Sequence, residues 1–138
     1  MADVTYELLD HCQFKRERIA SNLRLTVAEF KLLQSFREDT LLSVHQLMER
    51  MELSSSRLTR IVDGLVTKKL VRRSSGEKDR RTIEITLTPE GSKVQQDLNA
   101  AYVKTHEDIL DLLPPEARDS VLLAMEKLRN AMREWAHD

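Results

Sequence analysis

The stretch from residue 53 to residue 91 changes its hydrophobic period, and this change constrains the fold more than any other feature. As far as Lys69 its apolar residues recur at helical spacing, at Leu58, Ile61, Val62 and Leu65. Beyond that point, Leu70 and Val71 begin one strand, and residues 82–87 alternate apolar and polar side chains as a second strand does. The polar turn SSGEKDRR separates the two. The stretch therefore predicts a helix followed by a two-stranded hairpin, which must lean on other elements because an isolated hairpin is marginally stable.

The same stretch is the basic part of a chain that is close to neutral. Residues 54–86 hold nine basic and four acidic residues, a balance of +5, so the rest of a chain whose total is -1 sums to -6. Charge separated in this way suggests a polyanion on one side of the protein. A charged helix and turn can also be no more than a solvated surface, so the neighbouring pattern has to decide between the two.

Two short helical segments precede the basic stretch, and each begins with a capping box. Thr26 with Glu29 opens the first, and Ser43 with Gln46 opens the second. After a brief break, a serine triplet offers N-caps for the basic helix. Two short helices joined tightly, the second starting with small polar residues and arginine, indicate a helix-turn-helix, whose second helix fits the major groove of DNA. With the basic hairpin behind it, the unit is a winged helix.

Longer amphipathic helices are predicted at both ends of the chain. An apolar stripe marks the first, over roughly residues 3–21. After the hairpin, Thr88 as N-cap and Pro89 at the first helical position open a helix that runs to about residue 113. A last helix begins at Pro115, and its apolar residues step by four and three, as in a heptad seam: Val121, Met125, Leu128, Met132 and Trp135.

The predicted fold is mainly α with a small β-hairpin wing, in a single domain over residues 1–138. Residues 26–88 form the winged helix-turn-helix, while residues 1–25 and 89–138 supply a dimerisation layer, since such long seamed helices exceed what a winged domain needs. Hydrophobic residues at 41% and charged residues at 33%, with three glycines and three prolines, indicate a soluble, helix-rich protein. The apolar runs are too short for a membrane span and the acidic N-terminus lacks a signal-peptide core, so a cytoplasmic protein is expected.

The residues themselves resemble the MarR family of transcriptional regulators. The segments that carry the resemblance are LTVAEFKLL (25–33), LMERMELSSSRLTRIVDGL (47–65), KKLVRR (68–73) and, above all, DRRTIEITLTPEG (79–91). The last matches the family's wing signature, an Asp-x-Arg followed by a strand that ends Leu-Thr-x-x-Gly. The resemblance implies a homodimer, built from helices at both termini, that binds a pseudo-palindromic operator in double-stranded DNA. It also implies that binding usually represses transcription until a small molecule or an oxidant intervenes.

Charge, position and resemblance together name the expected DNA contacts. On the recognition helix, the residues expected to meet the major groove are Ser54, Ser55, Ser56, Arg57, Thr59 and Arg60. On the hairpin, the residues expected at phosphates or in the minor groove are Arg72, Arg73, Lys78, Asp79, Arg80 and Arg81. By similarity, Asp79 would brace the wing and Arg81 would enter the minor groove. Asp79 could simply cap the turn, and we expect it to do so and also to orient an arginine.

Two positions of the recognition helix hold residues that are unexpected there, one at the end of the helix and one inside it. Lys69 stands where the family often has a glycine that ends this helix in the left-handed conformation. A lysine there is strained, or the helix ends differently. Gly64 lies inside the helix, where glycine costs about 1 kcal/mol relative to alanine.

The effector, metal and redox sites are less sharply indicated. An effector pocket, if there is one, is expected between the winged part and the terminal helices, with candidate lining residues Phe14, Phe30, Phe36 and Tyr102. The lone cysteine, Cys12, lies on an apolar helical stripe, which favours a buried small hydrophobe over the peroxide-sensing cysteine of some family members. No metal-ligand spacing joins His11, His45, His106 and Glu107, so neither a metal nor another cofactor is expected.

A winged-helix protein-interaction module with weak, sequence-indifferent DNA affinity is the alternative function. The density of arginine in the wing counts against it. An enzyme is not expected, because the sequence holds no glycine-rich phosphate loop, no recognisable Ser, His and Asp spacing and no metal-ligand motif.

Overall fold

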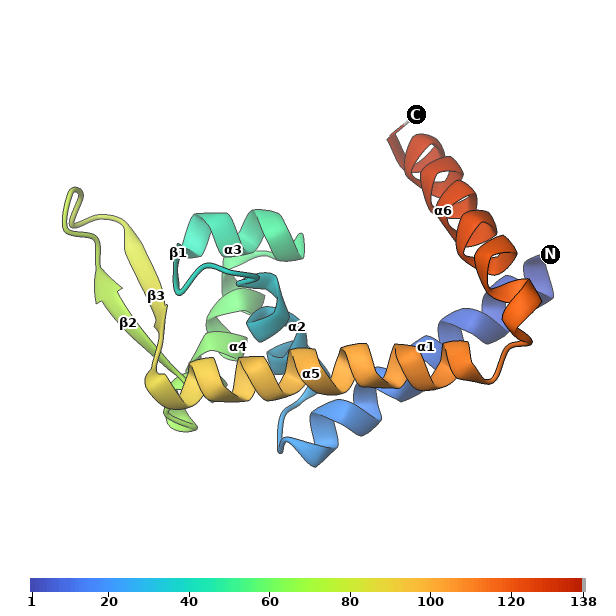
Figure 1. Ribbon diagram of the computed structural model, residues 1–138. Helices are drawn as coiled ribbons and strands as arrows, with labels where there is room; N and C mark the ends of the chain where they lie inside the picture. The colour runs from blue at the N-terminus through green and yellow to red at the C-terminus, as the bar shows by residue number, and fades with distance from the viewer. Residues whose placement is uncertain (138) are drawn as a thin grey trace. The chain divides into compact units, whose positions relative to one another are not determined.

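The computed structural model describes residues 1–137 and has six helices and a small three-stranded antiparallel sheet in that range (Figure 1). The helices are α1 (Ala2–Asn22), α2 (Val27–Ser35), α3 (Val44–Met51), α4 (Ser55–Thr67), α5 (Pro89–Asp111) and α6 (Pro115–His137). The strands are β1 (Leu41–Ser43), β2 (Val71–Ser75) and β3 (Ile83–Leu87). Contacts divide the chain into two compact units, Met1–Ala101 and a second that starts at Tyr102. The predicted class, mainly α with a β-hairpin wing, is confirmed.

The sheet contains a strand that the sequence pattern did not predict. Strand β1 pairs antiparallel with β3, so the order is β1-β3-β2 and the predicted two-stranded hairpin is one strand short. The register places Leu42 opposite Ile85, and both side chains are buried. A three-residue strand is too short to show alternation, which is why the pattern missed it. Its pairing ties the hairpin to the helices, as the marginal stability of a lone hairpin requires.

The core of the first unit forms where α2, α3 and α4 meet the sheet. Of the predicted stripe on α4, Leu58, Val62 and Leu65 are buried and Ile61 is half-buried. The other large side chains that are fully buried in the described residues are Phe30, Leu32, Leu33, Phe36, Leu42, Leu47, Val71, Ile85 and Leu98. Alternation along β3 also holds for its inner residues, whereas Ile83, at the outer end of the hairpin, is exposed. The hydrophobic periods therefore predicted the core faces of this unit.

Helix starts follow the predicted caps. Both capping boxes are present, with backbone N–H groups donating to the hydroxyls of Thr26 and Ser43 at 3.1 Å each. The Ser54 hydroxyl accepts from the N–H of Arg57 at the start of α4. At the start of α5, the Thr88 hydroxyl accepts from the N–H of Gly91 at 3.0 Å. Each cap satisfies a backbone donor that a helix otherwise leaves without a partner.

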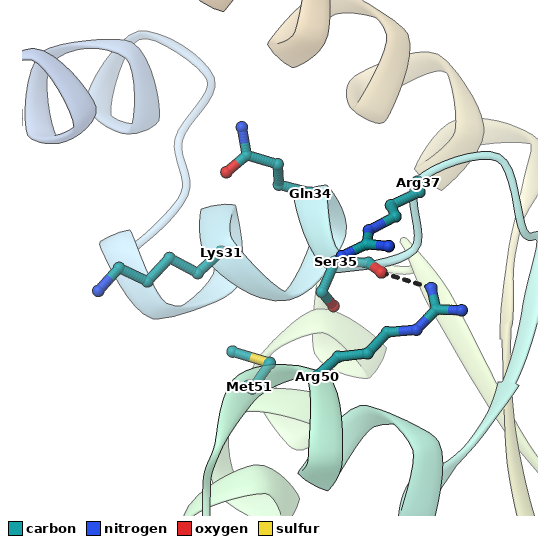
Figure 2. Close-up of a pocket in the computed structure, with 6 residues that line it drawn as sticks. All are labelled: Lys31, Gln34, Ser35, Arg37, Arg50 and Met51. Carbon is teal, nitrogen blue, oxygen red and sulfur yellow. Dashed lines mark hydrogen bonds between the residues drawn. The ribbon is translucent and has the colours of Figure 1, made fainter. Parts of the chain in front are cut away.

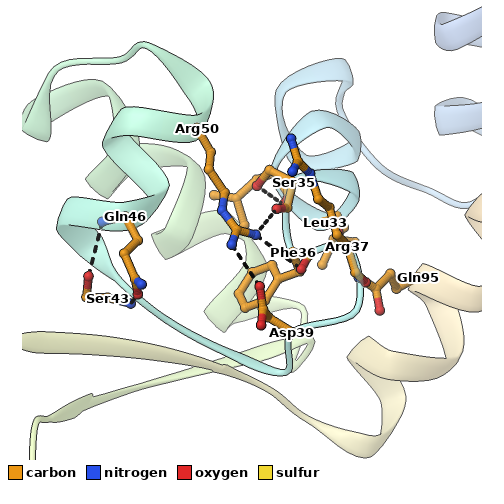
Figure 3. Close-up of polar contacts among 10 residues, drawn as sticks. Leu33, Ser35, Phe36, Arg37, Asp39, Ser43, Gln46, Arg50 and Gln95 are labelled. Atoms are coloured by element: carbon orange, nitrogen blue, oxygen red, sulfur yellow. Dashed lines mark hydrogen bonds and ion pairs between the residues drawn. The ribbon is translucent and has the colours of Figure 1, made fainter.

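Two long polar side chains hold the C-terminal end of α2 (Figure 3). From α3, Arg50 donates to the Ser35 carbonyl at 2.8 Å and to Asp39 at 2.8 Å. From α5, the buried amide of Gln95 donates to the carbonyls of Leu33 and Arg37 at 3.1 and 3.0 Å. These carbonyls are the acceptors that a helix end leaves open. The two side chains thus join α3 and the first part of α5 to the same helix end, which the sequence did not indicate.

The end of α4 resolves the two alternatives for Lys69. Its φ is +60°, so it adopts the left-handed conformation that glycine favours. Its N–H donates to Val66 at 2.9 Å, and the N–H of Leu70 donates to Leu65 at 2.9 Å. This pair of bonds is the Schellman pattern of a helix end. The helix therefore ends where the family's glycine would end it, with a lysine held in the strained conformation.

Replacing Lys69 with glycine is expected to raise the free energy of unfolding by about 0.5–1 kcal/mol, because glycine adopts a positive φ without a Cβ penalty. Urea unfolding of the wild type, Lys69→Gly and Lys69→Ala measures the effect. The alanine variant removes the charge but keeps the Cβ, so it should stay close to the wild type. A glycine variant less stable than the wild type would contradict the assignment of strain to the backbone.

The interior glycine of α4 has a packing reason. A Cβ at Gly64 would lie 2.8 Å from Oε1 of Glu29, the capping-box residue of α2. The Glu29 side chain is buried, and its Oε2 accepts from Lys68 at 2.6 Å and from the Thr26 N–H at 3.3 Å. Glycine therefore leaves room for a carboxylate that joins α2 to the end of α4, which offsets its lower helix propensity.

Candidate nucleic-acid interface

The first turns of α4 present the six residues that the sequence assigned to the recognition helix. Ser54, Ser55, Ser56, Arg57, Thr59 and Arg60 are all exposed. Some hydroxyls already have local partners, since Thr59 donates to the Ser55 carbonyl at 2.8 Å and the hydroxyl oxygens of Ser54 and Ser56 lie 3.3 Å apart. The guanidinium groups of Arg57 and Arg60 make neither an ion pair nor a hydrogen bond with any residue between 1 and 137. This surface can therefore offer two arginine forks and several short polar groups to a ligand.

The wing ends in a turn braced by Asp79. The Asp79 carboxylate accepts from the N–H of Arg81 at 2.9 Å, and its carbonyl accepts from the N–H of Thr82 at 3.0 Å. A Cβ at Gly76 would lie 2.8 Å from the same carbonyl, so the turn closes tightly around that glycine. Asp79 therefore caps the turn, as expected. Within the described chain its carboxylate contacts the backbone of Arg81 and no arginine side chain, so any orienting effect acts through the backbone.

The basic residues of the wing fall into two groups. Arg72, Lys78, Arg80 and Arg81 are exposed, and over residues 1–137 their side chains have no hydrogen bond or ion pair. Arg73 differs, because its Nη2 lies 2.7 Å from Oδ1 of Asp63 on α4. The sequence placed Arg73 with the other wing cations, and the contact with Asp63 could not be seen there because the two residues lie on different elements. The structure therefore pairs one of the predicted cations with a carboxylate of the same chain.

Two cavities lie beside α2, and the second also borders α4. The first, about 370 Å³, opens between α2 and α3 (Figure 2) and is lined by Lys31, Gln34, Ser35, Arg37, Arg50 and Met51. The second, about 480 Å³ and mainly apolar, is lined by Val27, Ala28, Lys31, Met51, Leu53, Arg57, Arg60 and Ile61. They share Lys31 and Met51. The second cavity therefore borders the exposed arginines of α4.

The aromatic residues expected in an effector pocket line neither of these cavities. Phe30 and Phe36 are fully buried in the core of the first unit, so the expectation that they line a pocket is wrong for these two. Phe14 is exposed, and Tyr102 is half-buried. An aromatic side chain at helical spacing carries the same pattern whether it fills a core or a pocket, and here it fills the core.

The cysteine and the histidines considered for redox or metal chemistry lie on helices α1, α3 and α5. Cys12, expected as a buried hydrophobe, is half-buried on α1. His45 lies 3.1 Å from Glu49, and the His106 ring packs on Tyr102 with their centroids 4.4 Å apart. Within residues 1–137, no three His, Cys, Asp or Glu side chains are grouped so that they could hold a metal ion. None of the helices in this range is both long and apolar enough to cross a membrane.

Comparison with known proteins gives matches that include the helix-turn-helix and most of the wing. A family model described as the MarR family matches residues 25–83. The uncharacterized HTH-type transcriptional regulator YfiV of Bacillus subtilis is 30% identical over 80% of this chain and 69% of its own length. The HTH-type transcriptional repressor MdtR of B. subtilis is 39% identical, but the match covers 49% of this chain and 43% of that relative.

Solved structures match over nearly the whole chain. The YusO protein of B. subtilis is 28% identical, covers 95% of each chain and has a TM-score of 0.76. Apo MarR from E. coli is 21% identical and covers 93% of this chain and 95% of its own, with a TM-score of 0.79. Because the sequence of the helix-turn-helix and wing and the fold around it both match, the chain belongs to the MarR family.

Proposed function

We propose that this protein is a sequence-specific DNA-binding transcriptional regulator. The observation that carries the proposal is the set of exposed cations on α4 and the wing: Arg57, Arg60, Arg72, Lys78, Arg80 and Arg81. Over residues 1–137 none of them is paired with a carboxylate, whereas Arg50, Lys68 and Arg73 are. Unneutralised cations on a helix-turn-helix and its wing suit the phosphates and grooves of DNA. YfiV and MdtR, both named as HTH-type transcription regulators or repressors, support this function.

In this proposal, α4 and the wing contact different parts of the DNA. The first turns of α4 carry hydroxyl and guanidinium groups that can hydrogen-bond base edges in the major groove. The wing carries cations on a narrow hairpin that can follow phosphates or enter the minor groove. In this proposal residues 26–88 form the DNA-binding part.

The terminal helices would make the protein a homodimer. Within residues 1–137, α6 has no buried residue, although its seam includes Met125 at 61% and Trp135 at 81% exposure. Helix α1 likewise exposes apolar side chains, among them Leu8 and Phe14. Exposed apolar faces on long helices usually pack against another helix. We therefore assign residues 1–25 and 89–138 to dimerisation, which would present two recognition helices to a pseudo-palindromic operator.

Replacing Leu128 with aspartate is expected to weaken this dimer at least tenfold, because it would place an unpaired charge in the α6 seam. Sedimentation equilibrium of the full chain measures the dissociation constant. Asn130→Asp is the matched control, since it adds the same charge to the same helix outside the seam. A wild type that stays monomeric, or equal dissociation constants for all three proteins, would contradict the seam.

Two finer features complete the proposal. Repression is the direction we propose, as in the repressor MdtR. Release by a small molecule is supported by the mainly apolar cavity of about 480 Å³ that borders Arg57 and Arg60, since a ligand there would lie against groups proposed to contact DNA. An oxidant acting at the half-buried Cys12 is the alternative signal.

Selection from a random duplex library and from genomic fragments tests the function, with the purified full chain as bait. Fluorescence anisotropy then compares the most enriched duplex with a scrambled duplex of the same composition at two salt concentrations. We expect the enriched duplex to bind at least about a hundredfold more tightly, with an affinity that falls steeply as salt rises. Equal, weak binding to every duplex would overturn the regulator and leave the protein-interaction module.

A further inference from the structure

An ion pair joins the recognition helix to the wing. Asp63 is the only acidic residue of α4, and its Oδ1 lies 2.7 Å from Nη2 of Arg73 on β2. Arg73 stands opposite Ile85 of β3, which also pairs with Leu42 of β1. Outward of Ser74 and Glu84 the sheet has two strands only. The pair therefore contacts the wing close to the point where it loses the support of β1.

Asp63 has a second cation within reach along its own helix. Arg60 precedes it by three positions, a spacing that brings side chains together on a helical surface. The structure nevertheless pairs Asp63 with Arg73. Arg60 is unpaired within the described chain, while the charge of Arg73 is compensated. Of these two cations, Arg73 is therefore the one that the structure ties to α4.

The pair is better suited to set geometry than to hold the fold together. Both side chains are partly solvated, at 39% exposure for Arg73 and 59% for Asp63, and pairs of this kind contribute little to stability. A charge-assisted hydrogen bond of 2.7 Å is nevertheless directional, because the guanidinium donors have fixed directions. Small changes in the angle of a hairpin produce larger displacements at its tip, where Lys78, Arg80 and Arg81 lie.

We propose that Asp63 is a positioning residue for DNA recognition: its ion pair with Arg73 sets the angle of the wing against α4, so that both make their groove contacts together. The inference rests on the proposed function. It concerns specificity rather than overall affinity, because losing the carboxylate also makes the surface one charge more positive. That added charge favours binding to any duplex, while a misplaced wing weakens binding to the selected one.

Anisotropy with the enriched and scrambled duplexes tests the proposal on full-length Asp63→Asn, Arg73→Gln and the swapped pair Asp63→Arg with Arg73→Asp. The readout is the ratio of the two dissociation constants. Asp97→Asn is the matched control, because it removes one exposed carboxylate from α5. We expect the ratio to fall at least about fivefold in both single variants, to recover in the swapped pair, and to stay at the wild-type value in the control. Urea unfolding should be nearly unchanged in all of them.

Other results overturn the proposal in separable ways. If Asp63→Asn tightens binding to both duplexes equally, as Asp97→Asn would, the carboxylate acts only through net charge. If the swapped pair is as unselective as the single variants, the effect belongs to the individual side chains and not to their pairing. A wild type without preference for the enriched duplex overturns the regulator itself, and the positioning role with it.

Discussion

Replacing Gly91 with alanine is expected to lower the free energy of unfolding by about 2–3 kcal/mol, at the upper end of what overpacking by one small group does. A Cβ at this position would lie 1.8 Å from the carbonyl oxygen of Leu70. That oxygen accepts the N–H of Thr88, the N-cap of α5, at 3.0 Å. It cannot retreat without breaking the contact between the start of α5 and the start of β2. The clash with the new Cβ is therefore relieved only if the backbone at position 91 moves away from the backbone of Leu70, because the atoms in the way belong to no flexible side chain.

Urea unfolding followed by circular dichroism measures this effect. Lys93→Ala is the matched control, since Lys93 is exposed on the same helix two residues later. It should stay within about 0.5 kcal/mol of the wild type. Equal stability of Gly91→Ala and the wild type would show that the helix start can move away from β2 and that the contact does not fix it.

Replacing Arg60 with alanine is expected to weaken binding to the enriched duplex about 10- to 100-fold and binding to the scrambled duplex much less. Arg60 is exposed on the first half of α4, and its guanidinium has no hydrogen bond or ion pair inside the described chain. An arginine that reads a base edge contributes roughly 1–3 kcal/mol of discrimination. The variant should therefore also change which sequences a new selection enriches.

Arg81→Ala provides the contrasting result in the same anisotropy assay. Arg81 lies in the braced turn of the wing, where its N–H is held by Asp79. If it acts through the groove and backbone, both duplexes should lose affinity by similar factors and the salt dependence should weaken by about one phosphate contact. Arg133→Ala on α6 controls for charge alone. Equal losses on both duplexes for Arg60→Ala would contradict base readout by α4.

Much of the local structure could be predicted from residues close together in the chain. The caps at Thr26, Ser43 and Thr88 depend on hydrogen bonds that span a single helical turn, so a short sequence pattern reports them. The apolar stripe of α4 and the alternation of β3 are also short sequence patterns, so they too report which faces are buried. The left-handed Lys69 was one of two alternatives, because a single residue does not show how a helix ends.

Features that depend on two distant segments were missed. Strand β1 is three residues long and exists because β3 lies beside it. The buried carboxylate of Glu29, with Lys68 as its partner, explains a glycine at 64 that looked unfavourable from propensity alone. The placement of Phe30 in the core rather than in a pocket also depends on what packs around it.

The sequence by itself determined the order and type of the main elements and the concentration of basic residues on one helix and one hairpin. Periodicity, caps and charge are properties of residues that are close together in the chain, so they can be recognised without knowing the fold. The tertiary structure decided which of those cations are paired, because the approach of β2 to α4 brings Arg73 to Asp63, whereas Arg60 is unpaired among the described residues. It also decided where glycine is required, since the close contact at Gly91 arises between segments that meet only in the folded chain.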